Sequence, residues 1–114
     1  MQNILKFFSA LSDKTRLRIF LLLTKEKLCV CELVSILNME QSRISHSLRI
    51  LKEADLVICQ RKGKWIIYSV NPEILKNRII QGLIQELSPL KKDLNALIKC
   101  KKQKIRESCK AQGS

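Results

Sequence analysis

The spacing of apolar residues changes twice along this chain. Over the first half they recur every three or four positions, as they do on one face of an α-helix. Residues 57–61 and 64–70 are instead rich in β-branched and aromatic side chains, and they flank Lys62-Gly63. A lysine-glycine step between two such runs predicts a tight β-hairpin. The helical spacing returns after Asn71, so the pattern predicts a mainly α chain with one two-stranded β-hairpin.

Two amphipathic helices are predicted at the start of the chain. The first covers residues 3–11. Its apolar side chains fall at i, i+3, i+4 and i+7, as Ile4, Phe7, Phe8 and Leu11. Ser12 is a favourable N-cap for the second helix, which is expected over about residues 13–24. The C-terminal half of that helix is apolar on nearly every side, which indicates a helix in the middle of the core.

Residues 28–57 predict a helix-turn-helix. Two short helical patterns meet there at a break around Asn38 and Met39. The second pattern has one apolar stripe, made of Ile44, Leu48 and Leu51. Its other faces carry hydroxyls and cations, which suit a DNA groove, although for a lone helix a solvated outer face is the simpler explanation. The helix before it and the hairpin after it favour a winged helix-turn-helix.

The charge balance narrows the class of partner. The chain has 114 residues, enough for one small domain, and a formal net charge of +12 from 22 basic and 10 acidic residues. This excess favours a polyanion, with nucleic acid ahead of an anionic membrane surface. No apolar run approaches the length of a membrane span, and the first residues lack the pattern of a secretory signal. We therefore expect a cytoplasmic protein with no membrane partner.

The C-terminal third is predicted to be helical at first. Residues 71–73, Asn-Pro-Glu, begin a helix that ends near residue 87, and Ser-Pro at 88–89 begins a second helix or a kinked continuation. Apolar residues follow a three-four spacing through both: Ile80, Leu83, Leu87, Leu90, Leu94 and Leu97. Such a stripe would pack against a second copy or, in its first half, within the chain.

The composition changes again near the C-terminus. Beyond Lys99 the chain is strongly basic, and we expect it to become disordered. The expected organisation is therefore a DNA-binding and dimerisation domain over residues 1–88. Residues 89–114 follow as a basic extension that is helical at its start.

Two closely spaced thiols, Cys29-Val30-Cys31, stand at the start of the first helix of the predicted helix-turn-helix. Five cysteines without an export signal favour reduced thiols used in metal or redox chemistry, although two small residues at a helix start are the alternative. A helix N-terminus, with Lys25 and Lys27 close in sequence, favours the thiolates that trivalent arsenic prefers. Side chains at i and i+2 of a helix point about 200° apart. One ion held by both sulfurs would therefore unwind the turn that positions the second helix.

Three segments together resemble the ArsR/SmtB family of metal-responsive repressors. They are ALSDKTRLRIFLLL, LCVCELVSILNMEQSRISHSLRILKEADLV and RKGKWIIYSVNPE, in that order, and the resemblance covers about residues 3–88. It implies a winged-helix homodimer that binds a palindromic operator in double-stranded DNA and leaves it when an effector binds. It also implies that helices 3–11 and 72–87 make the dimer. The residues expected there are Ile4, Phe7, Phe8, Leu75, Ile79 and Leu83.

The same resemblance suggests the effector. Residues 28–33, LCVCEL, look like the thiol motif of the arsenical and antimonite sensors, which implies As(III) or Sb(III) bound by Cys29 and Cys31. Those sensors commonly have a further cysteine three residues later, where this chain has Val34. A third sulfur could come from Cys59, Cys100 or Cys109. The alternative is binding by two thiols with an outside ligand.

Other functions remain open at this point. The same fold could sense a soft divalent metal such as Cd, Pb or Hg, or a redox or persulfide signal through its cysteines. A dimeric scaffold whose basic tail binds polyanions without sequence preference would lose that binding with salt. An enzyme is disfavoured, because the sequence has no C-x-x-C, no glycine-rich phosphate loop and no second histidine.

The repressor reading assigns roles to particular polar residues. Those expected to reach base edges or the phosphates beside them are Arg43, Ser45, His46 and Arg49. Those expected to hold phosphates are Ser42, Arg61, Lys62 and Lys64. A basic hairpin tip can also serve only to keep an edge strand soluble. The lone histidine is expected to make a DNA or packing contact and not to bind metal.

Overall fold

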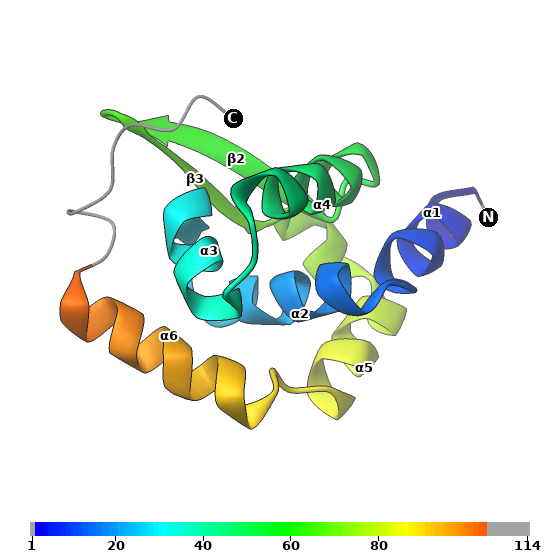
Figure 1. The fold of residues 1–114 in the computed structure, drawn as a ribbon. Coiled ribbons are helices and arrows are strands. Elements are labelled where there is room, and N and C mark those ends of the chain that lie inside the picture. The colour runs from blue at the N-terminus through cyan, green and yellow to red at the C-terminus, as the bar shows by residue number, and fades with distance from the viewer. Residues whose placement is uncertain (1, 105–114) are drawn as a thin grey trace.

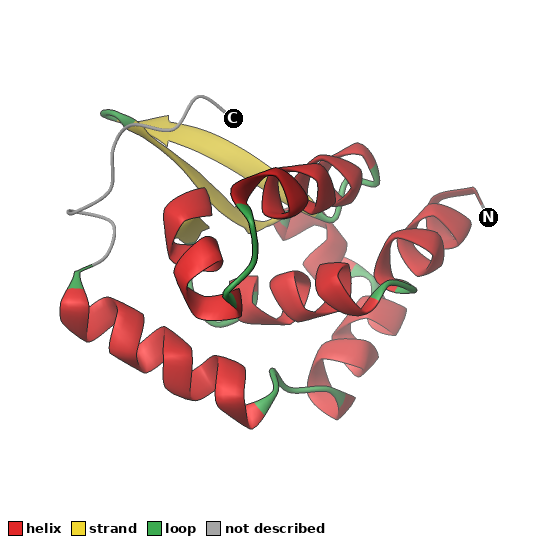
Figure 2. Ribbon diagram, in the orientation of Figure 1, coloured by secondary structure: helices red, strands yellow, loops and turns green. Residues whose placement is uncertain are grey.

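A computed structural model describes residues 2–104 of the chain, and within them a small antiparallel sheet lies at one edge of a group of helices (Figures 1 and 2). The elements are α1 (Gln2–Leu11), α2 (Lys14–Leu23), β1 (Leu28–Cys29), α3 (Val30–Leu37), α4 (Gln41–Glu53), β2 (Val57–Lys62), β3 (Trp65–Val70), the 3-10 helix η1 (Pro72–Lys76), α5 (Arg78–Glu86) and α6 (Lys91–Gln103). The α3–α4 pair followed by the β2–β3 hairpin is a winged helix-turn-helix, as the sequence predicts.

The sheet has one strand more than the predicted hairpin. Its order is β1-β3-β2, with Leu28 opposite Tyr68 and Cys29 opposite Ile67 in the added pair. A strand of two residues is too short to show an alternating pattern, which explains why the sequence does not reveal it. The hairpin turns at Gly63, whose φ of +61° is the left-handed value that favours glycine at the first central position of a two-residue turn.

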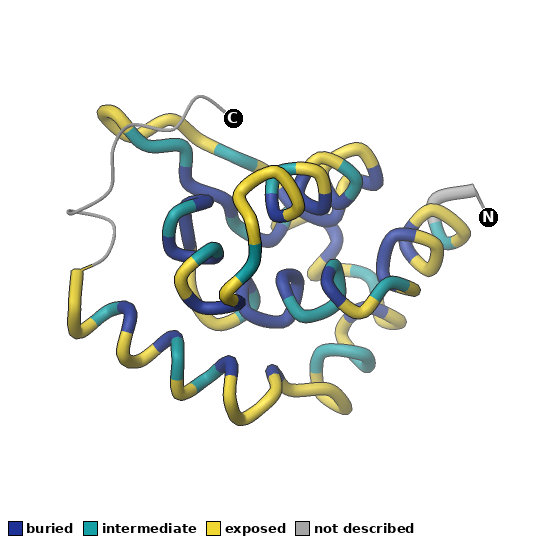
Figure 3. Tube along the Cα trace, viewed as in Figure 1, coloured by how far each residue is buried: buried dark blue, intermediate teal, exposed yellow. Residues whose placement is uncertain are grey.

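Helix α2 occupies the middle of the fold. Ile19, Phe20 and Leu22 are fully buried, and Figure 1 shows α2 running between α4 and α6. Figure 3 shows the same arrangement by burial, since the buried segments of the neighbouring elements turn towards α2. The apolar C-terminal half of this helix is therefore the centre of the core, as its composition predicts.

The start of α2 differs from the prediction by one residue. Asp13 and not Ser12 is the N-cap, and its carboxylate accepts a hydrogen bond from the Arg16 backbone N–H at 3.1 Å. The Ser12 hydroxyl instead donates to the Ser9 carbonyl at 2.7 Å. Two neighbouring residues can both cap a helix, and Ser12 is used to close α1 while Asp13 opens α2.

The predicted apolar stripe at the C-terminal end is interrupted. Helix α5 ends at Glu86, and Leu87 and Leu90 are 41% and 42% exposed in the link to α6. The two ends of the stripe, Ile80 and Leu97, are buried within the same chain. The expectation of one continuous seam for a second copy is therefore wrong, because the chain folds back between the two helices.

The helix expected over 72–87 is also divided. The 3-10 helix η1 ends at Lys76, and the Asn77 side chain then accepts hydrogen bonds from the backbone N–H groups of Ile79 and Ile80 to start α5. Helix α6 continues to Gln103, four residues beyond Lys99. Residues 105–114, which include Cys109, lie outside the described part of the chain.

Helix α6 packs back against α2 and α3. Near its start, Asp93 is 1% exposed and receives two hydrogen bonds from the Arg18 guanidinium, at 3.0 and 2.8 Å. The hydrogen bond to Asp93 raises the pKa of Arg18 and outweighs the opposing effect of burial. Near its other end, Lys101 Nζ lies 3.1 Å from a carboxylate oxygen of Glu32 on α3. The C-terminal helix is thus fixed by ion pairs at two places, to α2 near its start and to α3 near its end.

Candidate nucleic-acid interface and thiol site

The turn of the helix-turn-helix is set by Asn38. This C-cap residue of α3 has φ 53° and ψ 51°, the left-handed conformation that asparagine tolerates better than most residues. Glu40 is already the N-cap of α4, so three residues connect the two helices. Ile44, Leu48 and Leu51 are fully buried, which confirms the predicted stripe and fixes which face of α4 looks outward.

The polar side chains predicted on α4 lie on its outer face. Ser42, Arg43, His46 and Arg49 are exposed, and Ser45 is half-buried. A convex row of hydroxyls, guanidinium groups and an imidazole on one helix can enter the major groove of B-DNA.

Arg43 is tied to the core helix. Its guanidinium donates a hydrogen bond to the Thr15 hydroxyl at 3.0 Å, and Thr15 is 4% exposed. The bond joins α4 to the first turn of α2. Because a guanidinium has five N–H donors in a fixed fork, Arg43 keeps other donors for a phosphate or a base edge.

His46 and Arg49 form a second polar pair, one turn apart. Arg49 Nη2 lies 2.9 Å from His46 Nδ1. Arginine can only donate, so Nδ1 is the acceptor and the proton of the neutral ring is on Nε2. An Nε2–H donor recognises acceptors, which in the major groove are N7 and O6 of guanine, N7 of adenine and O4 of thymine. The pair therefore leaves the Nε2–H group as the donor that His46 can offer to a partner.

The tip of the wing carries three exposed cations, Arg61, Lys62 and Lys64. The Lys64 ammonium lies 4.9 Å from the centre of the Trp65 ring, within the range of a cation–π contact. That contact holds one cation on the hairpin, where a phosphate can approach it.

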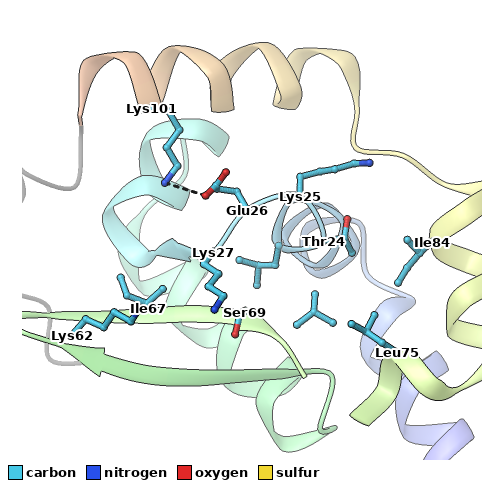
Figure 4. A pocket seen from close by; sticks show the side chains of 12 residues that line it. Thr24, Lys25, Glu26, Lys27, Lys62, Ile67, Ser69, Leu75, Ile84 and Lys101 are labelled. Carbon is cyan, nitrogen blue, oxygen red and sulfur yellow. Dashed lines mark ion pairs between the residues drawn. The ribbon is translucent and has the colours of Figure 1, made fainter. Parts of the chain in front are cut away.

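Lys62 also borders a cavity of about 580 Å³ between the sheet, η1, α5 and α6 (Figure 4). The rim carries further lysines, and its lining includes Ile67, Leu75 and Ile84. In the same view Lys101 Nζ approaches Glu26 at 3.9 Å, so the end of α6 closes one side of this cavity.

The two closely spaced cysteines lie at the junction of β1 and α3. Cys29 is fully buried and is the N-cap of α3, with φ −94° and ψ 170°. Cys31 is half-buried in the first turn of the helix and is held in a disulfide. The expectation that residues 29–31 are regular helix is wrong for Cys29, because its pairing with Ile67 in the sheet keeps it extended.

Glu32 was not anticipated as part of this site. It is 2% exposed, and its Oε1 accepts a hydrogen bond from the Cys29 backbone N–H at 3.0 Å. This is half of a capping box, in which the third residue of a helix satisfies the N-cap. Its other oxygen, Oε2, accepts from Lys101 at 3.1 Å. The three-residue spacing from Cys29 to Glu32 is that of a capping box and could have suggested this pair. Cysteine is an unusual N-cap residue, however, so the pattern is easy to miss.

The other described cysteines differ in position. Cys59 pairs with Tyr68, which also pairs with Leu28, so Cys59 shares a sheet face with Leu28 and not with Cys29. Cys100 is 2% exposed on α6. Among residues 2–104 no group of three or more His, Cys, Asp or Glu side chains is placed to hold a metal ion.

The residues predicted at a dimer interface are divided between surface and core. Phe8, Leu75 and Ile79 are 48%, 42% and 50% exposed, while Ile4 and Leu83 are partly buried against the core. Phe7 is 8% exposed and belongs to the core of its own chain. Leu5 of α1 is the most exposed large apolar residue of the described chain at 60%.

The described helices include none that is long and apolar enough to cross a bilayer. The fold, the outer face of α4 and the basic wing together define a winged helix-turn-helix regulator. Comparison with known proteins gives the family.

Residues 13–58 match the family described as "Bacterial regulatory protein, arsR family". The arsenical resistance operon repressor of Bacillus subtilis is 39% identical over 80 residues, which are 69% of this chain and 71% of that protein. The chain belongs to the ArsR family, which is a family of transcriptional regulators and not of enzymes.

The names of two other relatives refer to resistance to different elements, arsenic and cadmium. The arsenic resistance transcriptional regulator ArsR1 of Pseudomonas putida is 44% identical over 59% of this chain and 53% of its own length. A cadmium resistance transcriptional regulatory protein CadC homolog of Staphylococcus aureus is 33% identical over 74% of this chain and 70% of its own. The chain spans between 52% and 61% of the length of several curated relatives that it matches.

Solved structures agree on the fold. HlyU from Vibrio cholerae N16961 superposes with a TM-score of 0.65 at 26% identity, over 74% of this chain and 90% of that one.

Proposed function

We propose that this chain represses transcription in the cytoplasm as a homodimer on a palindromic operator in double-stranded DNA, and that As(III) or Sb(III) releases it by binding Cys29 and Cys31. The observation that carries the proposal is the position of Cys29. It is fully buried where β1 ends and α3 begins, so an ion can reach its sulfur only if that junction opens.

The outer face of α4 supports the DNA-binding part. Arg49 and His46 are exposed and paired, so two donors are presented together to base acceptors. The wing cations, Arg61, Lys62 and Lys64, are exposed at the tip of the hairpin and suit phosphates on the flanking backbone. In a dimer the two recognition helices would sit about 34 Å apart, one turn of duplex.

The apolar surface of α1, η1 and α5 supports the homodimer. Phe8, Leu75 and Ile79 expose large apolar side chains there, with the less exposed Ile4 and Leu83 beside them. Ile4 and Phe7 border a shallow cavity together with Ile74, so α1 lies next to η1. A second copy that covers this surface would remove several such side chains from water, and each contributes about 1.5–3 kcal/mol when fully buried.

The junction of β1 and α3 supports the release mechanism. Opening it would break the pairing of Cys29 with Ile67 and the hydrogen bond from Cys29 N–H to Glu32. Both interactions fix the start of α3, and α3 is joined to α4 by three residues. Ten- to hundredfold release requires a difference of about 1.4–3 kcal/mol between the two states. Bonds from a soft ion to two thiolates are strong enough for that.

The test is a gel shift on the DNA upstream of the gene, with protein reduced beforehand so that the Cys31 disulfide is open. We expect arsenite to release the wild-type protein and the control Cys59→Ser, but not Cys29→Ser or Cys31→Ser. Full release of either of the last two variants would overturn the proposal. Binding that is indifferent to operator sequence would favour a non-specific polyanion binder.

A second candidate keeps the fold and the operator but replaces the effector. The disulfide at Cys31 favours an oxidant, because two thiols that form a disulfide give up two electrons and two protons to it. The name of the staphylococcal relative favours a soft divalent metal such as Cd. Operator release measured with arsenite, cadmium and hydrogen peroxide, each against a reduced sample, separates the three.

A further inference from the structure

A third sulfur for the proposed effector site lies on α6. We propose that Cys100 supplies it, so that one trivalent ion is held by Cys29, Cys31 and Cys100. This inference rests on the proposed function, since it assumes that the pair at the start of α3 binds the ion. It makes the C-terminal helix a part of the effector site.

The bridge at Glu32 places Cys100 near the pair. Lys101, the next residue after Cys100, donates to Glu32 Oε2 at 3.1 Å. Glu32 directly follows Cys31, and its Oε1 accepts from the backbone N–H of Cys29 at 3.0 Å. Cys31 therefore precedes, and Cys29 is hydrogen-bonded to, a single carboxylate that is 2% exposed, and Cys100 precedes the lysine that binds the other oxygen of that carboxylate.

The buried face of α6 points Cys100 towards the fold. Asp93, Leu97 and Cys100 fall at i, i+4 and i+7, and they are 1%, 7% and 2% exposed. The first of them is held by Arg18 of α2, and α6 packs along α3 (Figure 1). Because the three share one face, the face that carries Cys100 is the one turned towards α2 and α3.

The register of the sheet disfavours Cys59 as the third sulfur ligand. Its pairing partner Tyr68 is also the partner of Leu28, so Cys59 is two strands from β1, about 9.5 Å. Cys29 is next to Leu28 and therefore faces the opposite side of the sheet. One ion cannot reach both sulfurs while the sheet is intact.

The binding reaction balances without an oxidant. Arsenous acid has three As–OH bonds, and each is replaced by an As–S bond as a thiol proton leaves with the hydroxyl as water. Arsenic stays trivalent throughout, and a phosphine reductant added beforehand supplies the two electrons that open the Cys31 disulfide, with two protons taken from water. Since no three-ligand group is preformed among the described residues, the ion assembles the site as Cys29 turns out of the sheet towards α6.

A pair of arsenicals tests the third ligand separately from the first two. Phenylarsine oxide is trivalent, but its phenyl group leaves only two bonds for thiols, so it needs Cys29 and Cys31 alone. Cys100→Ser and Cys100→Ala should weaken the release of operator by arsenite about tenfold or more, a difference of about 1.4 kcal/mol. Both variants should respond to phenylarsine oxide as the wild type does, which also shows that they fold. The matched control Cys59→Ser should change neither response.

Each other outcome has a defined meaning. A wild-type arsenite response in both Cys100 variants overturns the inference, and so does an equal loss of both arsenical responses in both variants. A loss of the arsenite response alone in Cys109→Ser, with Cys100→Ser unaffected, also overturns it and assigns the third sulfur to Cys109. If the wild-type protein stays on its operator with both arsenicals, the proposed function fails instead.

Discussion

The outer face of α4 and the start of α3 differ in how far their polar groups are exposed to water. On α4 the imidazole and guanidinium groups are in water and bond mainly to one another or to a neighbouring hydroxyl. At the start of α3 Cys29 and Glu32 are removed from water and bonded into the core. An exposed group can bind a large partner without disturbing the fold. A buried group cannot bind anything unless the fold changes, which is what an effector site requires.

The largest predicted effect is a loss of stability on substitution of Asp93. This residue lies on α6, which packs against the buried region at the start of α3. Asp93→Ala leaves the Arg18 guanidinium, whose side chain is 13% exposed, without its carboxylate. We expect the free energy of unfolding, measured by urea titration, to fall by about 3 kcal/mol, because a mostly buried charge loses its partner. Glu73→Ala is the control, since the Glu73–Lys76 pair is about three-quarters exposed on both sides and contributes less than about 0.5 kcal/mol. Equal losses in the two variants would contradict the idea that α6 is fixed by Asp93.

Arg49→Ala should act on the exposed region only. We expect operator affinity to fall by about 1–3 kcal/mol and the preference for operator over unrelated DNA to shrink, because the donor that we propose to contact bases and its bond to His46 are both lost. The measurement is fluorescence anisotropy on both duplexes, with Lys102→Ala on the exposed side of α6 as the control. The interpretation fails if Arg49→Ala weakens both duplexes equally.

Glu32→Gln should act on the buried region only. The amide can still accept the hydrogen bond from Cys29 N–H, but it loses the charge that binds Lys101. We expect a loss of about 1 kcal/mol in stability and release at about fivefold lower arsenite, because the closed junction is weakened. Glu26→Gln is the control, as the Glu26–Lys101 contact is longer, at 3.9 Å, and more exposed. Unchanged arsenite sensitivity in Glu32→Gln would show that Glu32 takes no part in the release of operator by arsenite.

Lys64→Ala should give the smallest change. Removal of one phosphate contact is expected to weaken all DNA alike by less than about 1 kcal/mol and to reduce the salt slope of binding by about one. Affinity measured over a range of salt concentrations provides the slope. A change in sequence preference with an unchanged slope would show that this lysine reads bases.

Local patterns in the sequence are enough to predict the elements of the recognition region. The stripe of Ile44, Leu48 and Leu51, the Asn38 turn and the basic hairpin tip each lie within a few residues, and the structure confirms their arrangement. The periodicity of apolar residues indicates which side of a helix is buried, and therefore also which side is exposed and available to bind a partner.

The surroundings of the thiols could not be predicted in the same way. The bonds from Arg18 to Asp93 and from Lys101 to Glu32 join residues 75 and 69 positions apart, and no local pattern encodes such a pairing. The two-residue strand that holds Cys29 extended is likewise visible only once Ile67 lies beside it. Binding of an ion by Cys29 and Cys31 remains a prediction from the sequence. The burial of Cys29, which would link that binding to a change in the fold, is seen only in the structure.

The Arg18–Asp93 pair also constrains how this architecture can shrink during evolution. A descendant that lost its last helix would lose Asp93 together with the helix that packs over Arg18 of α2, so the guanidinium would return to water. Loss of the whole helix should therefore be tolerated with arginine still at position 18, whereas loss of the Asp93 carboxylate alone should not.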